Sequence, residues 1–96
     1  MDIDMVRVRI TDIVDGLETG KCIHLIRFRE ADGATHSFEF QLLRKKHPQF
    51  RFIERFENDR VQEEFLDLDA VLVMCNWLLY LKFDVNIISP YTEEDN

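Results

Sequence analysis

The feature that most constrains the fold of this chain is an apolar run inside Asp69–Asp84, which reads DAVLVMCNWLLYLKFD. The residues from Val71 to Leu81 are all apolar or aromatic except Asn76. This run is shorter than the ~18 to 20 apolar residues that a transmembrane helix needs. Its Leu, Met and Trp content predicts a helix that begins at Asp67 or Asp69 as N-cap and ends near Lys82. The valines in 71–73 leave a buried strand as the alternative.

Upstream of this run, apolar residues alternate with polar ones at the two-residue period of β-strands. The segment MVRVRI places Val6, Val8 and Ile10 on one face. In the next two segments the residues expected to share the buried face are Cys22, His24, Ile26, Phe28, His36, Phe38, Phe40 and Leu42. We therefore expect an α+β fold: an antiparallel β-meander of three to four strands packed against one C-terminal apolar helix, with 84–89 as a candidate short final strand.

The turn between 21–29 and 35–43 sets the register of a predicted hairpin. A three-residue loop, Ala31-Asp32-Gly33, places Gly33 where a left-handed backbone is needed. This loop pairs Phe28 with His36 and His24 with Phe40, so that large apolar residues share one face.

Residues 50–65 are ambiguous between strand and helix, because FRFIERFEN alternates but is followed by the acidic ENDRVQEEFLDLD. The chain length corresponds to one domain, 1–96. Its last residues, 91–96, are expected to form a frayed acidic tail.

The formal charge of −7, from 19 acidic and 12 basic residues, disfavours direct binding to nucleic acid or to anionic membranes. It suits a protein partner instead. Cys22 and Cys75 lie far apart and form no CxxC pair, and the acidic start MDID is unlike a signal peptide. We therefore expect reduced thiols, a cytoplasmic location and no membrane contact.

The histidines and cysteines offer little for metal or catalytic chemistry. In the predicted register His24 and His36 lie about 13 Å apart, too far to share a zinc ion. The one enzyme-like grouping is Cys22, His24 and Asp12, if the first hairpin pairs Ile10 with Ile26. A buried histidine anchored by Asp12 is the simpler interpretation of that grouping, and no cofactor is expected.

The predicted outer face of the sheet carries a concentration of arginines. The first-hairpin register sets Arg7 opposite Arg29 and Arg9 opposite Arg27, and like charges in such positions repel. Acidic residues concentrate further along the chain and include Glu57, Asp59, Glu63 and Glu64. Three explanations compete: internal pairing of the two sets, a basic binding face, or an acidic surface that imitates a phosphate backbone.

The predicted C-terminal helix is apolar around more of its circumference than one sheet can cover. One stripe suits the sheet and consists of Val71, Met74, Cys75, Leu78 and Leu81. The residues that point elsewhere include Leu72, Val73, Trp77 and Tyr80. Either the segment 50–65 covers them, or they form a protein–protein interface, most simply in a homodimer.

These observations predict a small non-catalytic protein–protein interaction module, which binds or inhibits a protein partner or serves as a subunit of an assembly. The alternative is an acidic nucleic-acid mimic that inhibits a nucleic-acid-binding protein, of the kind that phages and mobile elements encode. A small thiol/histidine enzyme is the outside alternative.

Overall fold

The computed structural model describes residues 3–57 and 59–89, with side chains from Ile10 onward. The predicted tail at 91–96 lies outside this described part. In chain order the elements are α1 (Ile3–Gly16), β1 (Cys22–Phe28), β2 (Thr35–Arg44), β3 (Gln49–Phe56), β4 (Asp59–Asp67), α2 (Leu68–Tyr80) and β5 (Asp84–Ile88).

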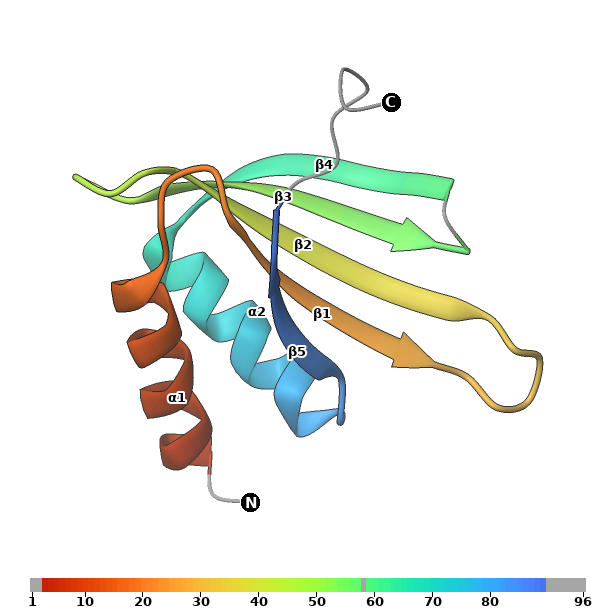
Figure 1. The fold of residues 1–96 in the computed structure, drawn as a ribbon. Helices are drawn as coiled ribbons and strands as arrows, with labels where there is room; N and C mark the ends of the chain where they lie inside the picture. Colours follow the sequence, from red (N-terminus) through yellow and green to blue (C-terminus); the bar gives the residue numbers. More distant parts are fainter. Residues whose placement is uncertain (1–2, 58, 90–96) are drawn as a thin grey trace.

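The strands form one antiparallel sheet in the order β4-β3-β2-β1-β5 (Figure 1). Strands β1 to β4 follow one another as a meander, and β5 returns from α2 to pair with β1. The predicted α+β class, with a C-terminal helix packed on an antiparallel meander, is confirmed, as is the short final strand. The ambiguous segment 50–65 belongs to two strands, β3 and β4.

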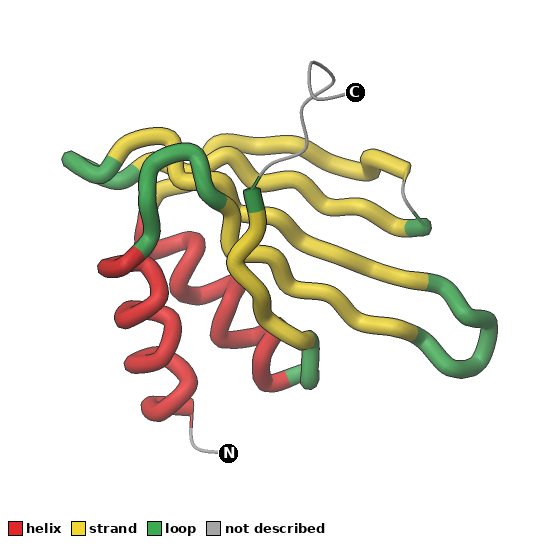
Figure 2. The backbone as a smooth tube through the Cα atoms, viewed as in Figure 1, coloured by secondary structure: helices red, strands yellow, loops and turns green. Residues whose placement is uncertain are grey.

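Both helices lie on the same face of the curved sheet, side by side (Figures 1 and 2). The chain measures 40 × 39 × 19 Å along its principal axes, and the short dimension fits one layer of helix on one layer of sheet. No helix in the described part of the chain covers the opposite face, which we call the open face of the sheet.

The prediction of a strand at MVRVRI was wrong, because this segment belongs to α1. The alternation of Val6, Val8 and Ile10 spans too few residues to fix the period. Over a longer window apolar residues at 3, 6, 10, 13, 14 and 17 lie on one side of a helix, because each has another of the set three or four positions away. Ile10, Val14 and Leu17 are buried in the core accordingly.

The predicted register of the β1–β2 hairpin was also wrong by one residue. Phe28 pairs with Thr35 and Leu25 with Phe38, because the loop holds four residues, Glu30 to Gly33. Backbone hydrogen bonds join Arg29 to Ala34 and to Gly33 around this loop. The Asp32 carboxylate accepts a hydrogen bond from the Ala34 amide at 3.0 Å, and Gly33 has the expected positive φ of 72°. The face of β1 that packs into the core is therefore that of Ile23 and Leu25, whereas Cys22 is buried outside that cluster and Phe28 is 63% exposed.

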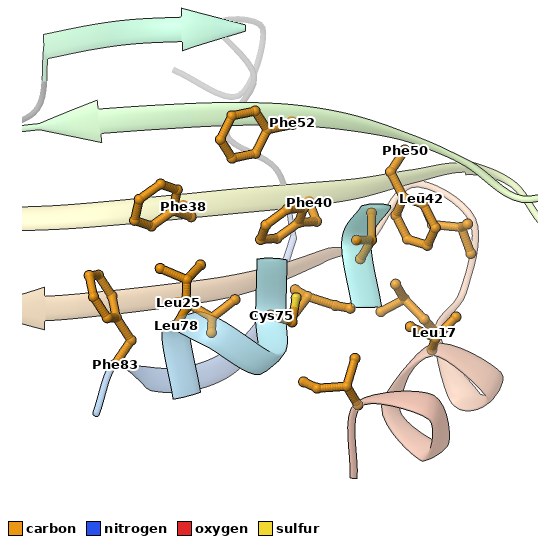
Figure 3. Packing of buried hydrophobic residues seen from close by; sticks show 14 residues of the cluster. Leu17, Leu25, Phe38, Phe40, Leu42, Phe50, Phe52, Cys75, Leu78 and Phe83 are labelled. Carbon is orange, nitrogen blue, oxygen red and sulfur yellow. The ribbon is translucent and has the colours of Figure 1, made fainter. Parts of the chain in front are cut away.

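The core lies between the helices and the aromatic residues of the central strands (Figure 3). The rings of Phe40 and Phe52 face each other across β2 and β3, with centroids 5.2 Å apart, and Phe38 lies 5.9 Å from Phe52. From α2, Cys75 and Leu78 project onto these rings. Burying aromatic side chains of this size is the largest favourable contribution available to so small a chain.

Helix α2 begins directly after β4, and Asp67 is its N-cap. The Asp67 side chain accepts a hydrogen bond from the Ala70 amide at 2.9 Å, which satisfies one of the free donors of the first turn. The predicted helix and one of its two predicted caps are thereby confirmed, and Asp69 lies inside the first turn.

Replacing Asp67 with alanine removes this cap, so Asp67→Ala should lower the free energy of unfolding by about 1 kcal/mol. Chemical denaturation monitored by circular dichroism measures the change. Asp69→Ala is the matched control, because it removes a carboxylate from the first turn without removing the cap and should cost only about 0.3 kcal/mol. Equal losses in the two variants would contradict the role assigned to Asp67.

Candidate interaction surface

The outward face of α2 carries three large exposed side chains. Val71, Cys75 and Leu78 point into the core, whereas Val73, Trp77 and Tyr80 are 56%, 60% and 57% exposed. They recur at positions i, i+4 and i+7, so they form one stripe along the helix. We call Val73, Trp77 and Tyr80 the α2 patch.

Leu72 does not belong to this patch, although the sequence placed it with the other three. It is partly buried and packs against the core cluster. Segment 50–65 does not cover α2 from outside, because its two strands lie in the sheet. Helix α1 packs beside α2 instead.

The α2 patch is exposed and also contains a hollow beside two aromatic rings that contact each other. The Trp77 and Tyr80 rings meet edge to face with centroids 6.0 Å apart. Among the described residues, Val73, Asn76, Trp77 and Tyr80 line a hollow of about 220 Å³. Aromatic side chains with few rotatable bonds, arranged in this way, are typical of the centres of protein interfaces.

Asn76 adds a polar group at the edge of this apolar hollow. Its Oδ1 atom is buried and accepts no hydrogen bond from the described part of the chain. Buried acceptors of this kind are rare, because they lose water without gaining a partner. Sequence reasoning gave Asn76 no role, although a lone amide within an apolar run was the available signal.

Several predicted charged residues are paired inside the chain. The Glu63 carboxylate accepts hydrogen bonds from Arg51 and Arg60, each at 2.9 Å. The hydrogen bond from Arg51 is the main cause that holds the pKa of Glu63 below its usual range. On the neighbouring strands Arg55 donates to Glu39 at 3.3 Å. This pairing agrees with the internal explanation for these charges.

The predicted arginine cluster is not formed by strand pairing, because α1 is a helix and is not part of the sheet. The side chains of Arg7 and Arg9 lie outside the described part of the chain. The Arg29 guanidinium pairs with Asp32 and lies 5.3 Å from the centre of the Phe56 ring. Arg27 lies over the Phe83 ring at 5.9 Å.

The other predicted acidic residues lie along the β3–β4 hairpin and are exposed. Glu57 has a positive φ of 53°, and its amide donates to the Thr35 carbonyl. Asp59 begins β4, and Glu64 accepts a hydrogen bond from Gln62 at 2.8 Å.

The enzyme-like grouping of Cys22, His24 and Asp12 is not assembled. Asp12 lies on α1, on the helix side of the sheet, whereas His24 projects from the open face beside Glu39. Burial raises the pKa of the Cys22 thiol to about 11, and Glu39 acts in the same direction. The thiol is therefore protonated near neutral pH and is a poor nucleophile.

The histidines also fall on different faces. His24 is on the open face, and His36 lies on the helix side, 2.7 Å from the Glu54 carboxylate. Within residues 3–57 and 59–89, no group of three or more His, Cys, Asp or Glu side chains is arranged to hold a metal ion.

Comparison with protein-family models, curated proteins and solved structures finds no match to this chain. The helices in the described part are all too short or too polar to span a bilayer. Function must therefore be inferred from the chemistry of the surface.

The raised thiol pKa values lead to a prediction about cysteine reactivity. Burial raises the pKa of Cys75 to about 12, so both thiols should resist disulfide exchange in the folded protein. At pH 8 the lower thiolate fraction alone should slow Cys22 by roughly 100-fold relative to an ordinary cysteine. Titration with a thiol-reactive dye should detect no fast thiol in the native state and two after denaturation. Rapid native labelling of Cys22 would contradict this.

The half-buried His24 imidazole leads to a prediction about pH. Burial is the main cause that lowers its pKa, with Arg55 lowering it further and Glu39 opposing both. As pH falls through about 6.5 the unfolded state takes up a proton before the folded state, so the free energy of unfolding falls. Between about pH 7.5 and about pH 5.5, thermal unfolding should show a larger decrease in Tm for the wild type than for His24→Gln.

The pH window separates this effect from that of the carboxylates. Asp32 and Glu63 have lowered pKa values and lose their contribution only at more acidic pH. His47→Gln, in the exposed β2–β3 loop, controls for the loss of a histidine as such. Identical pH dependence in the wild type and His24→Gln would refute the assignment.

Proposed function

We propose that this chain is a small, non-catalytic protein–protein interaction module, and that the α2 patch is its docking surface. The observation that carries the proposal is the exposure of Val73, Trp77 and Tyr80 beside one apolar hollow. Contiguous apolar surface of this kind is costly to leave in water and favours aggregation unless a partner covers it.

The two other exposed aromatic residues of the described chain do not gather in this way. Phe28 and Phe65 stand on β1 and β4, with β2 and β3 between them. Isolated apolar residues are common on protein surfaces and require no partner. The α2 patch differs because its aromatic rings contact each other and share a hollow.

The geometry of the patch favours a helix that carries an apolar stripe as the occupant. A stripe at i, i+4 and i+7 is the pattern by which one helix packs against another, with aliphatic and aromatic side chains filling the gaps. The acidic-mimic alternative has less support, because Glu39, Glu54 and Glu63 each lie beside a basic side chain or a histidine.

Replacing Trp77 with glutamate should weaken binding without unfolding the chain. Because Trp77 is largely exposed, we expect Trp77→Glu to change the free energy of unfolding by less than about 0.5 kcal/mol. Loss of an aromatic anchor should weaken the complex by about 2 kcal/mol or more, roughly thirtyfold in Kd. Affinity capture followed by mass spectrometry, with the chain's own association measured by sedimentation, provides the readout.

Phe28→Glu is the matched control, since Phe28 is an equally exposed aromatic residue outside the α2 patch. It should leave binding unchanged. If the wild type neither self-associates nor retains a partner, or if both variants bind like the wild type, the proposal fails.

A further inference from the structure

We infer that the α2 patch is covered by a second copy of the same chain, packed antiparallel about a two-fold axis that passes near Asn76. This inference rests on the proposed function and names the occupant of that surface. Three features of α2 carry it: the orphan amide, the apolar stripe, and the charges at its two ends.

The Asn76 amide favours a second Asn76 as its hydrogen-bond partner. Asn76 Oδ1 is buried without a hydrogen-bond donor in the described part of the chain, and Asn76 lines the hollow of the patch. A carboxamide carries both donors and an acceptor. A residue that lies near a two-fold axis contacts the same residue of the second copy. With its carboxamide turned so that Oδ1 faces the hollow that the side chain lines, Asn76 would donate to the Oδ1 atom of the second Asn76 and accept from its Nδ2 group.

A paired asparagine in an apolar helix seam also fixes register. In coiled coils a single buried asparagine specifies alignment and oligomeric state, because any other alignment leaves the amide unpaired. An apolar partner helix would offer Asn76 Oδ1 no hydrogen-bond donor and would leave it unsatisfied. The amide therefore selects against a purely apolar occupant.

The apolar stripe is compatible with the same axis. Antiparallel packing about residue 76 places Val73 of one copy within one position of Tyr80 of the second copy. The small valine would then lie against the larger aromatic pair formed by Trp77 and Tyr80. Large side chains against small ones allow two helices to approach closely.

The charges at the ends of α2 select the antiparallel orientation. Asp69 lies in the first turn, and Lys82 follows the last turn. They are seven and six residues from Asn76, or about 10.5 Å and about 9 Å along the helix. Antiparallel packing brings each Asp69 near Lys82 of the second copy, whereas parallel packing would set Asp69 against Asp69. Neither residue forms an ion pair within the described part of the chain.

The first test measures association of the unaltered full-length chain. Sedimentation equilibrium over a wide concentration range should show a reversible monomer–dimer equilibrium. Asn76→Asp places two carboxylates on the axis and should weaken the dimer about tenfold or more at neutral pH. Asn86→Asp makes the same chemical change at an exposed position on β5 and should leave the dimer unaltered. A wild-type chain that stays monomeric at every concentration overturns the inference.

The second test locates the axis. In an Asn76→Cys variant, confirmed as folded by circular dichroism, residue 76 of each copy should lie close enough to form a symmetric disulfide under mild oxidation. Gln62→Cys, on the exposed edge strand β4, is the matched control and should cross-link more slowly. Covalent dimers through residue 76 support the inference; equal or faster cross-linking through residue 62 overturns it.

The combined outcomes separate this inference from the proposed function. A monomeric wild type that still retains another protein through Trp77 refutes the second copy and leaves the interaction module in place. A dimer that is insensitive to Trp77→Glu and does not cross-link through residue 76 refutes the α2 patch as the docking surface, and both proposals fail together.

Discussion

The contact between α2 and the aromatic residues of β2 and β3 is the interaction on which the rest of this fold depends. Val71, Cys75 and Leu78 lie on one stripe of the helix and are buried against a layer that includes Phe40 and Phe52. Neither partner is stable alone, because an isolated short helix is marginal in water and an uncovered sheet exposes its rings. The sheet therefore fixes which side of α2 turns inward, and by geometry which side turns outward.

The outward side is what gives this chain a candidate function. A two-layer domain covers a helix from the sheet below and from a neighbouring helix at one flank, here α1. The outer surface of the helix remains free to face solvent or a partner. On α2 that surface carries Trp77 and Tyr80, and it borders an amide whose buried oxygen has no hydrogen-bond donor among the described residues. Both features are unfavourable in the isolated chain and become favourable when a matching surface covers them.

The sequence predicted the features that depend on residues close together in the chain better than those that depend on pairing between segments. Helix α2 was predictable because its cap, Asp67, and its apolar run are local signals. Counting apolar faces left Trp77 and Tyr80 either covered by segment 50–65 or exposed, and the placement of that segment in the sheet decided between the two. Helix α1 was missed because the alternation of Val6, Val8 and Ile10 was taken as a strand pattern, although a longer window has the period of a helix. The β1–β2 register was missed because the length of the turn is set by hydrogen bonds among Arg29, Asp32 and Ala34 that the sequence pattern does not reveal.

The sequence by itself determined that this chain is an α+β domain whose C-terminal helix is too apolar for a single sheet to cover. Local periodicity, capping and composition are sufficient for that conclusion, since they depend on residues close together in the chain. Only the tertiary structure decided which residues share a surface. It separated Asp12 from His24, placed Leu72 against the core, and left Asn76 beside the α2 patch with a buried oxygen that no described residue donates to. These outcomes depend on strand register and helix placement, where a shift of one residue moves a side chain to the opposite face.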